Sequence, residues 1–275
     1  MVLGLIWLVL SLGLSGLIYY FSGLYQVWYY FFVPIVSVPL LYLLLFGLYV
    51  LVVWLASLFM DKTKINEKPD HFALWLIRQT CIQILFLFGV RVHVSGKEKL
   101  PSSGNVVIVS NHLSDFDQFC ILMAFPEFPM IWVSKPENFD IPIAGGWIAR
   151  AGYLPINRED PIEGVRTIRK AAAIAEKGLA SVGISPEGTR SRDHHLHDFK
   201  PGAFRVATLS KRPLVTVALQ NTWKIPHNLF RRITNVYLDV LEVDDYEKIK
   251  DENTVALAER IHNLIAEKLA EDKVH

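Results

Sequence analysis

The first 60 residues contain no Asp, Glu, Lys, Arg or His, and this charge-free stretch limits the possible folds more than any other feature of the chain. A water-soluble domain carries charged side chains on its surface, whereas the core of a bilayer excludes them. The first charged residue is Asp61, and all other charges follow it. The sequence therefore predicts that residues 1–60 form a membrane segment joined to a water-soluble part.

Two apolar runs within this segment are long enough to cross a bilayer. We expect one helix over about residues 2–20 and a second from near Pro39 to about Met60. About 21 residues rising 1.5 Å each span roughly 31 Å, the thickness of a bilayer core. Tyr, Trp and Phe crowd the stretch between the two runs, as is typical of a membrane–water interface. The predicted structure is a transmembrane helical hairpin.

Positive charges indicate on which side of the membrane the rest of the chain lies. Lys62, Lys64 and Lys68 directly follow the second run, and short loops rich in Lys and Arg stay in the cytoplasm. We therefore expect the N-terminus and the chain beyond Asp61 to face the cytoplasm, at a bacterial inner membrane. A cleaved signal peptide is the weaker interpretation, because no Lys or Arg precedes the first apolar run.

Residues 61–90 are predicted to include a helix that lies in the membrane interface. Asp70 is a plausible N-cap of this helix, and Gly89 a plausible stop. A third membrane span is the alternative, and it would move the remaining domain across the membrane. Four polar side chains interrupt the apolar surface and favour the interfacial helix: Arg78, Gln79, Thr80 and Gln83.

From about residue 90 onward, strand-like and helix-like patterns alternate. Short apolar or alternating runs predict strands, and residues 161–177 and 253–271 predict amphipathic helices. This alternation predicts an α/β domain over residues 91–275, with a mixed, mainly parallel sheet flanked by helices. The expected strands are 90–94, 106–110, 130–134, 179–185, 213–219 and 233–243.

Global charge and cysteine content exclude some classes of protein. A net charge of +1 over 275 residues gives no indication of a nucleic-acid partner. Cys81 and Cys120 lie far apart without metal-binding spacing, so we expect two buried thiols rather than a disulfide framework or a zinc site.

His112 and Asp117 directly follow the apolar run 106–110, in the spacing His-x-x-x-x-Asp. Ligands of open α/β sheets bind beyond the carboxyl ends of the strands. A carboxylate on one ring nitrogen fixes the histidine tautomer and leaves the other nitrogen free to take a proton. The pair is a candidate general base with its orienting acid, although spacing alone also fits a structural histidine.

Two neighbours leave the assignment of this loop open. Asp115 is an alternative partner of His112 or an N-cap for a helix beginning near Phe116, and we favour solvent exposure or capping. Either the hydroxyl of the substrate or that of Ser114 could be the nucleophile that His112 activates.

A cluster of histidines lies further along the chain. His194, His195, His197 and Asp198 could chelate a metal, but a hydrophilic loop is the preferred interpretation.

Two further motifs indicate phosphate binding. GYLPINR ends in Arg158, and PEGTRS places Glu187, Gly188, Thr189 and Arg190 directly after a predicted strand. Glycine permits close backbone approach, and arginine presents a planar fork to phosphate oxygens. We expect Arg158 and Arg190 to form a two-arginine clamp; ordinary surface ion pairs are the alternative.

Four blocks in order resemble the PlsC-type 1-acyl-sn-glycerol-3-phosphate acyltransferases of the glycerolipid acyltransferase family. These are NHLSDFD (111–117), GYLPINR (152–158), PEGTRS (186–191) and RPLVTVAL (212–219), and FKPGAF (199–204) also matches. The resemblance covers about residues 90–225. Ser185, Leu154 and Pro155 depart from the usual residues of the family.

The resemblance implies an enzyme that transfers a fatty acyl group from acyl-CoA or acyl carrier protein to lysophosphatidic acid, giving phosphatidic acid. His112 and Asp117 would be the catalytic pair, and no metal or cofactor is required. The residues that bind the acceptor would be Arg158, Glu187, Gly188, Thr189 and Arg190. Lys135 would either add positive charge near the phosphate or be an ordinary solvated lysine. Alternatives are another lysolipid or glycerol 3-phosphate as acceptor, a membrane lipid hydrolase that uses Ser114, and a non-catalytic lipid-binding protein.

Overall fold

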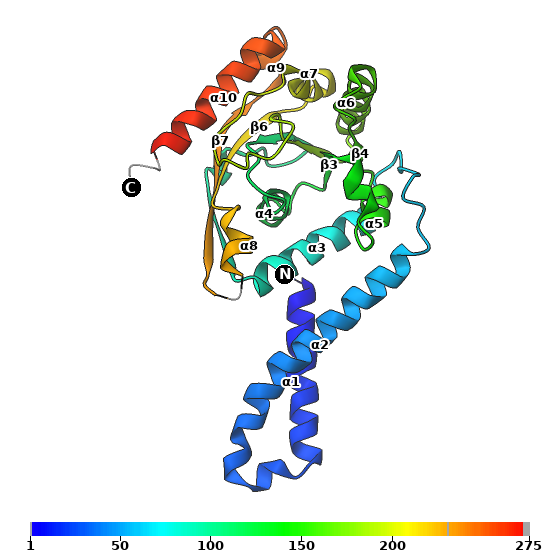
Figure 1. Ribbon diagram of the computed structural model, residues 1–275, viewed down its shortest axis with the longest axis vertical. Helices are drawn as coiled ribbons and strands as arrows, with labels where there is room; N and C mark the ends of the chain where they lie inside the picture. Colours follow the sequence, from blue (N-terminus) through cyan, green and yellow to red (C-terminus); the bar gives the residue numbers. More distant parts are fainter. Residues whose placement is uncertain (1, 230, 272–275) are drawn as a thin grey trace.

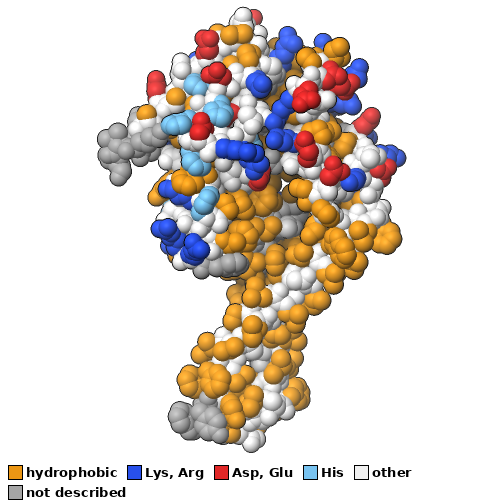
Figure 2. Space-filling view, viewed as in Figure 1, with side chains coloured by type: hydrophobic (Ala, Val, Ile, Leu, Met, Phe, Trp, Pro, Cys, Tyr) orange, Lys and Arg blue, Asp and Glu red, His pale blue; other side chains and the backbone are white. Residues whose placement is uncertain are grey.

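The computed structural model describes residues 2–229 and 231–271, and it consists of an α/β domain from which a pair of long helices projects (Figure 1). The paired helices are α1 (Val2–Phe21) and α2 (Phe32–Ser57), joined by the 3₁₀ turns η1 (Leu24–Gln26) and η2 (Trp28–Phe31). Both are long and apolar enough to cross a membrane, and Figure 2 shows many hydrophobic and no charged side chains on the visible face of this pair. The first helix agrees with the expected residues.

The second helix begins earlier than its sequence indicated. It starts at Phe32 instead of near Pro39 and ends at Ser57, so Pro39 lies inside it. A proline lacks the N–H that bonds to the preceding turn, which made Pro39 look like a first helical residue. Apolar helices tolerate a proline when neighbouring groups support the freed carbonyl. Pro34, in contrast, lies in the first turn, where the N–H has no intrahelical partner.

The helix α3 (His71–Leu87) lies between the paired helices and the α/β domain (Figure 1). Its N-terminus is capped as predicted, because the Asp70 carboxylate accepts the N–H of Ala73 at 3.0 Å. Gly89 follows its end with a φ of 65°, in the left-handed region that glycine adopts freely.

Three of the four polar side chains that interrupt the apolar surface of α3 contact the paired helices. Gln79 accepts the backbone N–H of Leu3, Gln83 accepts the hydroxyl of Tyr42, and Thr80 shares a hydrogen bond with Tyr49. The fourth, Arg78, donates to the carbonyl of Leu122 in the α/β domain. These polar groups therefore join α3 to its neighbours.

In the described part of the chain, seven strands form one sheet in the order β1-β7-β6-β2-β5-β3-β4. Every neighbouring pair is parallel except β6 and β7, which run antiparallel. The mixed, mainly parallel sheet confirms the predicted fold class. The strands are β1 (Val90–Ser95), β2 (Val107–Ser110), β3 (Met130–Ser134), β4 (Leu154–Pro155), β5 (Ser181–Ile184), β6 (Leu214–Gln220) and β7 (Thr234–Asp244).

Helices cover both faces of this sheet. α3 and α4 pack together on one face, and α6, α7 and α10 lie over the other (Figure 1). The helices of the domain are α4 (Asp117–Ala124), α5 (Gly145–Arg150), α6 (Pro161–Glu176), α7 (Arg205–Ser210), α8 (Lys224–Asn228), α9 (Tyr246–Ile249) and α10 (Thr254–Glu271), with 3₁₀ turns η3 (Lys97–Lys99), η4 (Pro136–Asp140) and η5 (Pro201–Phe204).

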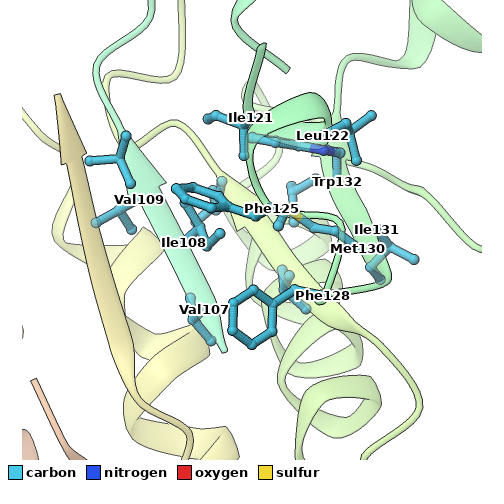
Figure 3. Close-up of a cluster of buried hydrophobic side chains, with 14 of the residues drawn as sticks. Val107, Ile108, Val109, Ile121, Leu122, Phe125, Phe128, Met130, Ile131 and Trp132 are labelled. Carbon is cyan, nitrogen blue, oxygen red and sulfur yellow. The ribbon is translucent and has the colours of Figure 1, made fainter. Parts of the chain in front are cut away.

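The core lies around the central strand β2, whose four residues are all buried. Figure 3 shows Val107, Ile108 and Val109 of β2 near Phe125 and the side chains of α4 and β3. Since β2 is covered on both faces, its residues Val107, Ile108 and Val109 are all apolar. The chain leaves this core at Ser110, so the next residues emerge at the carboxyl edge of the sheet.

Candidate active site

Three neighbouring strands deliver polar residues to one edge of the sheet. β2 pairs in parallel with both β5 and β6, so the residues that follow each of them emerge at the same side. These residues are 111–117, 185–191 and 221–224. The structure therefore brings together two of the motifs that the sequence singled out, as strand topology predicted.

His112 and Asp117 form a hydrogen-bonded pair at this edge. His112 Nδ1 lies 2.8 Å from Asp117 Oδ2. The same oxygen accepts the backbone N–H groups of Leu113 at 2.7 Å and Ser114 at 2.9 Å. With a carboxylate as its acceptor, Nδ1 carries the proton, and Nε2 is left as the basic nitrogen. Asp117 is 1% exposed, so this arrangement is shielded from water.

Thr222 also donates a hydrogen bond to Asp117, and the sequence analysis did not identify this residue. Its hydroxyl donates to Asp117 Oδ1 at 2.5 Å, and the residue is fully buried. The only available signal was its place two residues beyond β6, at the same edge as His112. Both oxygens of Asp117 thus accept hydrogen bonds.

The backbone of the β2–α4 loop is fixed from both sides. His112 N–H donates to Glu187 Oε1 at 2.6 Å, and Ser191 N–H donates to the His112 carbonyl at 2.9 Å. The Asn111 amide exchanges two hydrogen bonds with the backbone of Leu219 in β6, at 2.9 and 2.8 Å. The turn 187–191 and strand β6 therefore hold the imidazole in place.

Glu187 is buried against the loop that carries His112. It is 3% exposed, and its second oxygen accepts the N–H of His197 at 3.2 Å. Burial raises the pKa of Glu187 above its ordinary value, and hydrogen bonds from the backbone of His112 and His197 partly offset this rise. The carboxylate of Glu187 contacts the backbone that carries the base.

Arg190 lies beside the site, one residue before Ser191. Its guanidinium forms an ion pair with Asp115, whose side chain is 74% exposed. Asp115 therefore neither orients His112 nor caps α4, whose N-cap, Phe116, makes no side-chain cap. The exposed carboxylate of Asp115 pairs with Arg190 instead.

Two further candidate substrate-binding residues are accessible to solvent. Thr189 is exposed, and Lys135 is half-buried directly after β3.

Arg158 lies next to Gly188, at the wall of a cavity of about 490 Å³ between α6 and α7. Gly188 has a φ of 74°, and a Cβ there would come within 2.9 Å of Lys200 Cε. Partial burial lowers the pKa of Arg158, and Glu137 partly offsets this effect. Arg190 is not among the residues that line this cavity, and its guanidinium pairs with Asp115 instead.

The remaining candidates have structural contacts. Ser114 Oγ accepts the backbone N–H of Phe116 at 3.3 Å. His194 stacks on Trp223 at 4.1 Å, and His197 Nε2 lies 3.0 Å from Asp193. Among residues 2–229 and 231–271, no three His, Cys, Asp or Glu side chains are grouped so that they could hold a metal ion.

Comparisons with known proteins identify relatives of this chain. Residues 91–220 match the Acyltransferase family model. The 1-acyl-sn-glycerol-3-phosphate acyltransferase of Borreliella burgdorferi is 30% identical over 215 residues, which are 73% of this chain and 80% of that protein. The chloroplastic 1-acyl-sn-glycerol-3-phosphate acyltransferase LPAT1 of Arabidopsis thaliana is 40% identical over 136 residues, which are 49% of this chain and 37% of that protein.

A solved structure shows the same fold. The crystal structure of the 1-acyl-sn-glycerophosphate (LPA) acyltransferase PlsC from Thermotoga maritima aligns with a TM-score of 0.60 at 22% identity, covering 97% of this chain and 98% of that chain. The extent of the match to the Borreliella protein, together with the family model, shows that this chain belongs to the PlsC-type 1-acyl-sn-glycerol-3-phosphate acyltransferase family and is an acyltransferase.

Proposed function

We propose that this enzyme transfers a fatty acyl group from acyl-CoA or acyl carrier protein to the free hydroxyl of lysophosphatidic acid, giving phosphatidic acid. The observation that carries the proposal is the buried Asp117 carboxylate on His112 Nδ1 at 2.8 Å. It leaves Nε2 as a base at the carboxyl edge of the sheet. The names of the relatives supply the acceptor.

The reaction then needs no nucleophile from the protein. Nε2 of neutral His112 takes the proton of the acceptor hydroxyl while the hydroxyl oxygen attacks the thioester carbonyl carbon. Asp117 stabilises the imidazolium that forms. The carbon–sulfur bond then breaks, and the departing thiolate takes the proton from His112. The products are the new ester and the free thiol of the donor, and the ring returns to its neutral form.

The phosphate of the acceptor is assigned to the basic groups nearest His112. In lysophosphatidic acid the phosphate is borne by the carbon next to the free hydroxyl, so it must lie close to the base. Arg190 adjoins Ser191, whose N–H binds the His112 carbonyl. Arg190 would exchange its exposed partner Asp115 for the phosphate, with Thr189 and Lys135 as further ligands. Gly188 lets the turn approach closely, and Arg158 stands beside it.

The remaining parts of the chain are assigned to the membrane. Residues 1–60 would be a transmembrane hairpin, residues 61–90 would hold α3 at the interface, and residues 91–275 would be a catalytic domain facing the bacterial cytoplasm. Both lipids reside in the bilayer, and exposing their chains to water costs about 0.8 kcal/mol per methylene. An active site beside the membrane avoids that cost.

The test is a transfer assay with the purified full chain in lipid. Lysophosphatidic acid would be supplied with oleoyl-CoA or with oleoyl carrier protein, and phosphatidic acid followed by mass spectrometry. We expect product from the wild type and none from His112→Ala. Absence of product with either donor, while the protein remains folded, would reject lysophosphatidic acid as the acceptor. Glycerol 3-phosphate and other lysolipids would then be tried.

A lipid hydrolase that uses Ser114 is the second candidate. In the described part of the chain, no hydrogen bond joins Ser114 Oγ to His112; this oxygen accepts from Phe116 instead. Hydrolysis would release free fatty acid, and Ser114→Ala would abolish it. Phosphatidic acid formation that survives Ser114→Ala would favour transfer to the hydroxyl of the acceptor.

A further inference from the structure

Three exposed arginines gather at the base of the α/β domain. Arg231 and Arg232 lie in the turn that precedes β7, and Arg91 is the second residue of β1. The two segments meet where Thr234 N–H donates to the carbonyl of Gly89, at 3.0 Å. In Figure 1 the start of β7 is level with the start of α1, on the side from which the paired helices project. We refer to Arg91, Arg231 and Arg232 as the basic patch.

No acidic residue lies near the basic patch along the chain. Residues 71–97, which supply α3 and β1, contain no Asp or Glu, and neither do residues 199–238, which supply α8 and the start of β7. In the part of the chain that the structure describes, no ion pair or side-chain hydrogen bond involves the three arginines of the patch. Their charge has no compensating carboxylate there, and the positive potential that it creates attracts anions.

Exposed apolar side chains flank the basic patch. Phe86, near the end of α3, is 63% exposed, and Ile233, next to Arg232, is 49% exposed. The ring centres of Phe86 and Tyr42 of α2 lie 6.1 Å apart, so the apolar surface of the paired helices continues to the patch. Figure 2 shows Lys and Arg side chains beside hydrophobic ones at the lower edge of the domain. Arginines next to exposed apolar side chains are typical of surfaces that bind at a membrane interface.

Position decides which anion the patch meets. In the proposed arrangement α1 and α2 lie in the bilayer, so the base of the domain is held at the lipid headgroups. The attraction between a basic side chain and a charged membrane fades within about 8 Å at physiological salt, so it acts only on groups that lie this close. The phosphodiester groups of anionic phospholipids are therefore the nearest anions. A nucleic acid would leave Phe86 and Ile233 in water, whereas a leaflet accepts both side chains.

We propose that the basic patch is a docking surface for anionic phospholipids, with Phe86 and Ile233 entering the leaflet beside it. The proposal rests on the placement of α1 and α2 in the bilayer and goes beyond acyl transfer. The paired helices hold the chain on any bilayer, whereas docking of the patch depends on the charge of the lipids. The enzyme thereby senses the anionic lipid content of its membrane.

Helix α8 connects the basic patch to the active site. Thr222, which donates to Asp117 Oδ1, lies just before α8, and the two arginines of the turn lie just after it. Docking therefore holds this side of the active site against the bilayer, where a lipid acceptor enters. We expect loss of the patch to raise the apparent KM for lysophosphatidic acid in anionic vesicles and to leave kcat unchanged.

The first experiment measures docking without turnover. Ile233→Cys provides a single reactive thiol for a fluorescent label that brightens when water is excluded, because Cys81 and Cys120 are buried. The labelled full chain would be reconstituted in vesicles of phosphatidylcholine, with or without phosphatidylglycerol. We expect the label to be shielded in the anionic vesicles only, and to be exposed again when about 1 M salt shortens the range of the attraction to about 3 Å.

Matched variants, each carrying the label, separate charge from shape. Arg231→Ala/Arg232→Ala removes two charges of the patch, Arg231→Lys/Arg232→Lys keeps them, and Lys170→Ala/Lys177→Ala removes two exposed charges at α6. One basic side chain near an anionic membrane favours the docked form about fivefold, so the first variant should lower the ratio of docked to free domain about thirtyfold. The other two should stay within about twofold of the wild type. An alanine variant that docks as well as the α6 control, or equal shielding of the wild type in neutral and anionic vesicles, would overturn the proposal.

Flotation and the transfer assay keep the separate assignments apart. A wild type that floats with both kinds of vesicle but shows no charge-dependent shielding has membrane-bound helices and no docking surface. One that floats with neither refutes the membrane placement of α1 and α2, and docking with it. In neutral detergent the variant Arg231→Ala/Arg232→Ala should form phosphatidic acid at the wild-type rate. If the wild type makes no phosphatidic acid but its label is shielded by anionic lipid, the acceptor assignment fails and the docking surface stands.

Discussion

Asp117 accepts four hydrogen bonds with two oxygens, and only one of them comes from the histidine it orients. Two others come from the backbone of Leu113 and Ser114, so the carboxylate also shapes the loop that carries His112. A base held in this way reaches the substrate already oriented, without reorganisation during the reaction. We therefore expect the side chains that support Asp117 to affect catalysis through the orientation of His112.

Thr222→Val tests this support. The change keeps the shape of the side chain but removes the donor to Asp117 Oδ1, leaving a buried charged oxygen unsatisfied. Such a loss costs about 1–3 kcal/mol, so we expect kcat to fall about tenfold while KM for the acceptor stays within about twofold. Steady-state kinetics would measure both, with Thr222→Ser as the matched control that restores the hydroxyl. Equal loss in Thr222→Ser would mean that packing, not the hydrogen bond, is responsible.

Glu187 gives a pH-dependent prediction. Burial raises the pKa of this carboxyl above its ordinary value of 4.5, so the folded protein holds the proton more tightly than the unfolded chain does. As pH rises from about the ordinary value through the folded pKa, this group therefore makes the protein less stable. Glu187→Gln removes the titration. We expect the stability of the wild type relative to this variant to fall over that pH interval, as followed by urea unfolding.

The matched control for this measurement is Glu163→Gln, since Glu163 lies at the surface of α6 and pairs only with Arg166 among the described residues. A wild-type advantage that stays constant with pH, or that grows as pH rises, would contradict the raised pKa of Glu187. The same substitution also tests position: Gln offers one acceptor oxygen where the carboxylate binds the N–H groups of both His112 and His197. Activity should therefore fall even where stability recovers.

At the scale of single residues, the sequence predicted that His112 and Asp117 pair, but not the contacts around them. His112 and Asp117 are close in the chain, and a turn into a helix brings such residues together. Thr222 and Glu187 reach the same loop from other strands, over 105 and 75 residues, and no local pattern encodes those contacts. Asp115 was assigned to solvent or capping, and its pairing with Arg190 depends on the same long-range folding.

Helices and strands were easier to predict where packing against the core imposes a regular spacing of apolar residues. The buried strands β2 and β3 follow from short apolar runs, and α6 follows from its amphipathic pattern. Strand β4, with two residues, carries too little sequence for any period. The predicted start of α2 was wrong because a uniformly apolar segment has no polar residue that marks where the helix begins. Pro39 was therefore taken as the first helical residue.

The polar side chains of α3 show how one element acquires a role that periodicity does not reveal. They were interpreted as a surface facing the membrane interface, yet Gln79 and Gln83 contact α1 and α2. We expect Gln79→Leu/Gln83→Leu to loosen the paired helices from α3. Interhelical hydrogen bonds in membranes contribute about 0.6 kcal/mol each, so losing both should speed opening about sevenfold.

Limited trypsin digestion would measure that opening, because Lys62, Lys64 and Lys68 lie in the segment between α2 and α3. Cleavage that depends on opening follows the population of the open form. His71→Leu, an exposed change on the same helix, is the control and should leave the rate unaltered. A double variant cleaved at the wild-type rate would mean that apolar contacts alone hold the paired helices.

At the scale of the whole molecule, both ends of the paired helices meet the α/β domain and the connecting turn lies far from it (Figure 1). Leu3 contacts α3 at one end, and Ser57 contacts the carbonyl of Pro142 at the other. A hairpin that crosses the membrane in this arrangement puts its tip on the side opposite the active site. One that only dips into the near leaflet leaves its tip inside the bilayer.

The native cysteines make these two arrangements distinguishable. Cys81 and Cys120 are both buried, and burial raises the pKa of Cys81 to about 12, so neither supplies an accessible thiolate near neutral pH. An introduced cysteine is then the reactive thiol of the chain. Gln26→Cys places it at the tip, in the exposed turn η1, and Glu67→Cys places it between α2 and α3, beside the domain.

We expect a membrane-impermeant maleimide to label these two positions from opposite sides of sealed vesicles. Right-side-out vesicles should expose Gln26→Cys and inverted vesicles Glu67→Cys, because crossing helices of 20 and 26 residues separate the two positions by the thickness of the bilayer core. Detergent should make both reactive in either preparation. If the tip reacted only after detergent, the paired helices would lie within one leaflet, and if both positions reacted from the same side, neither helix would cross.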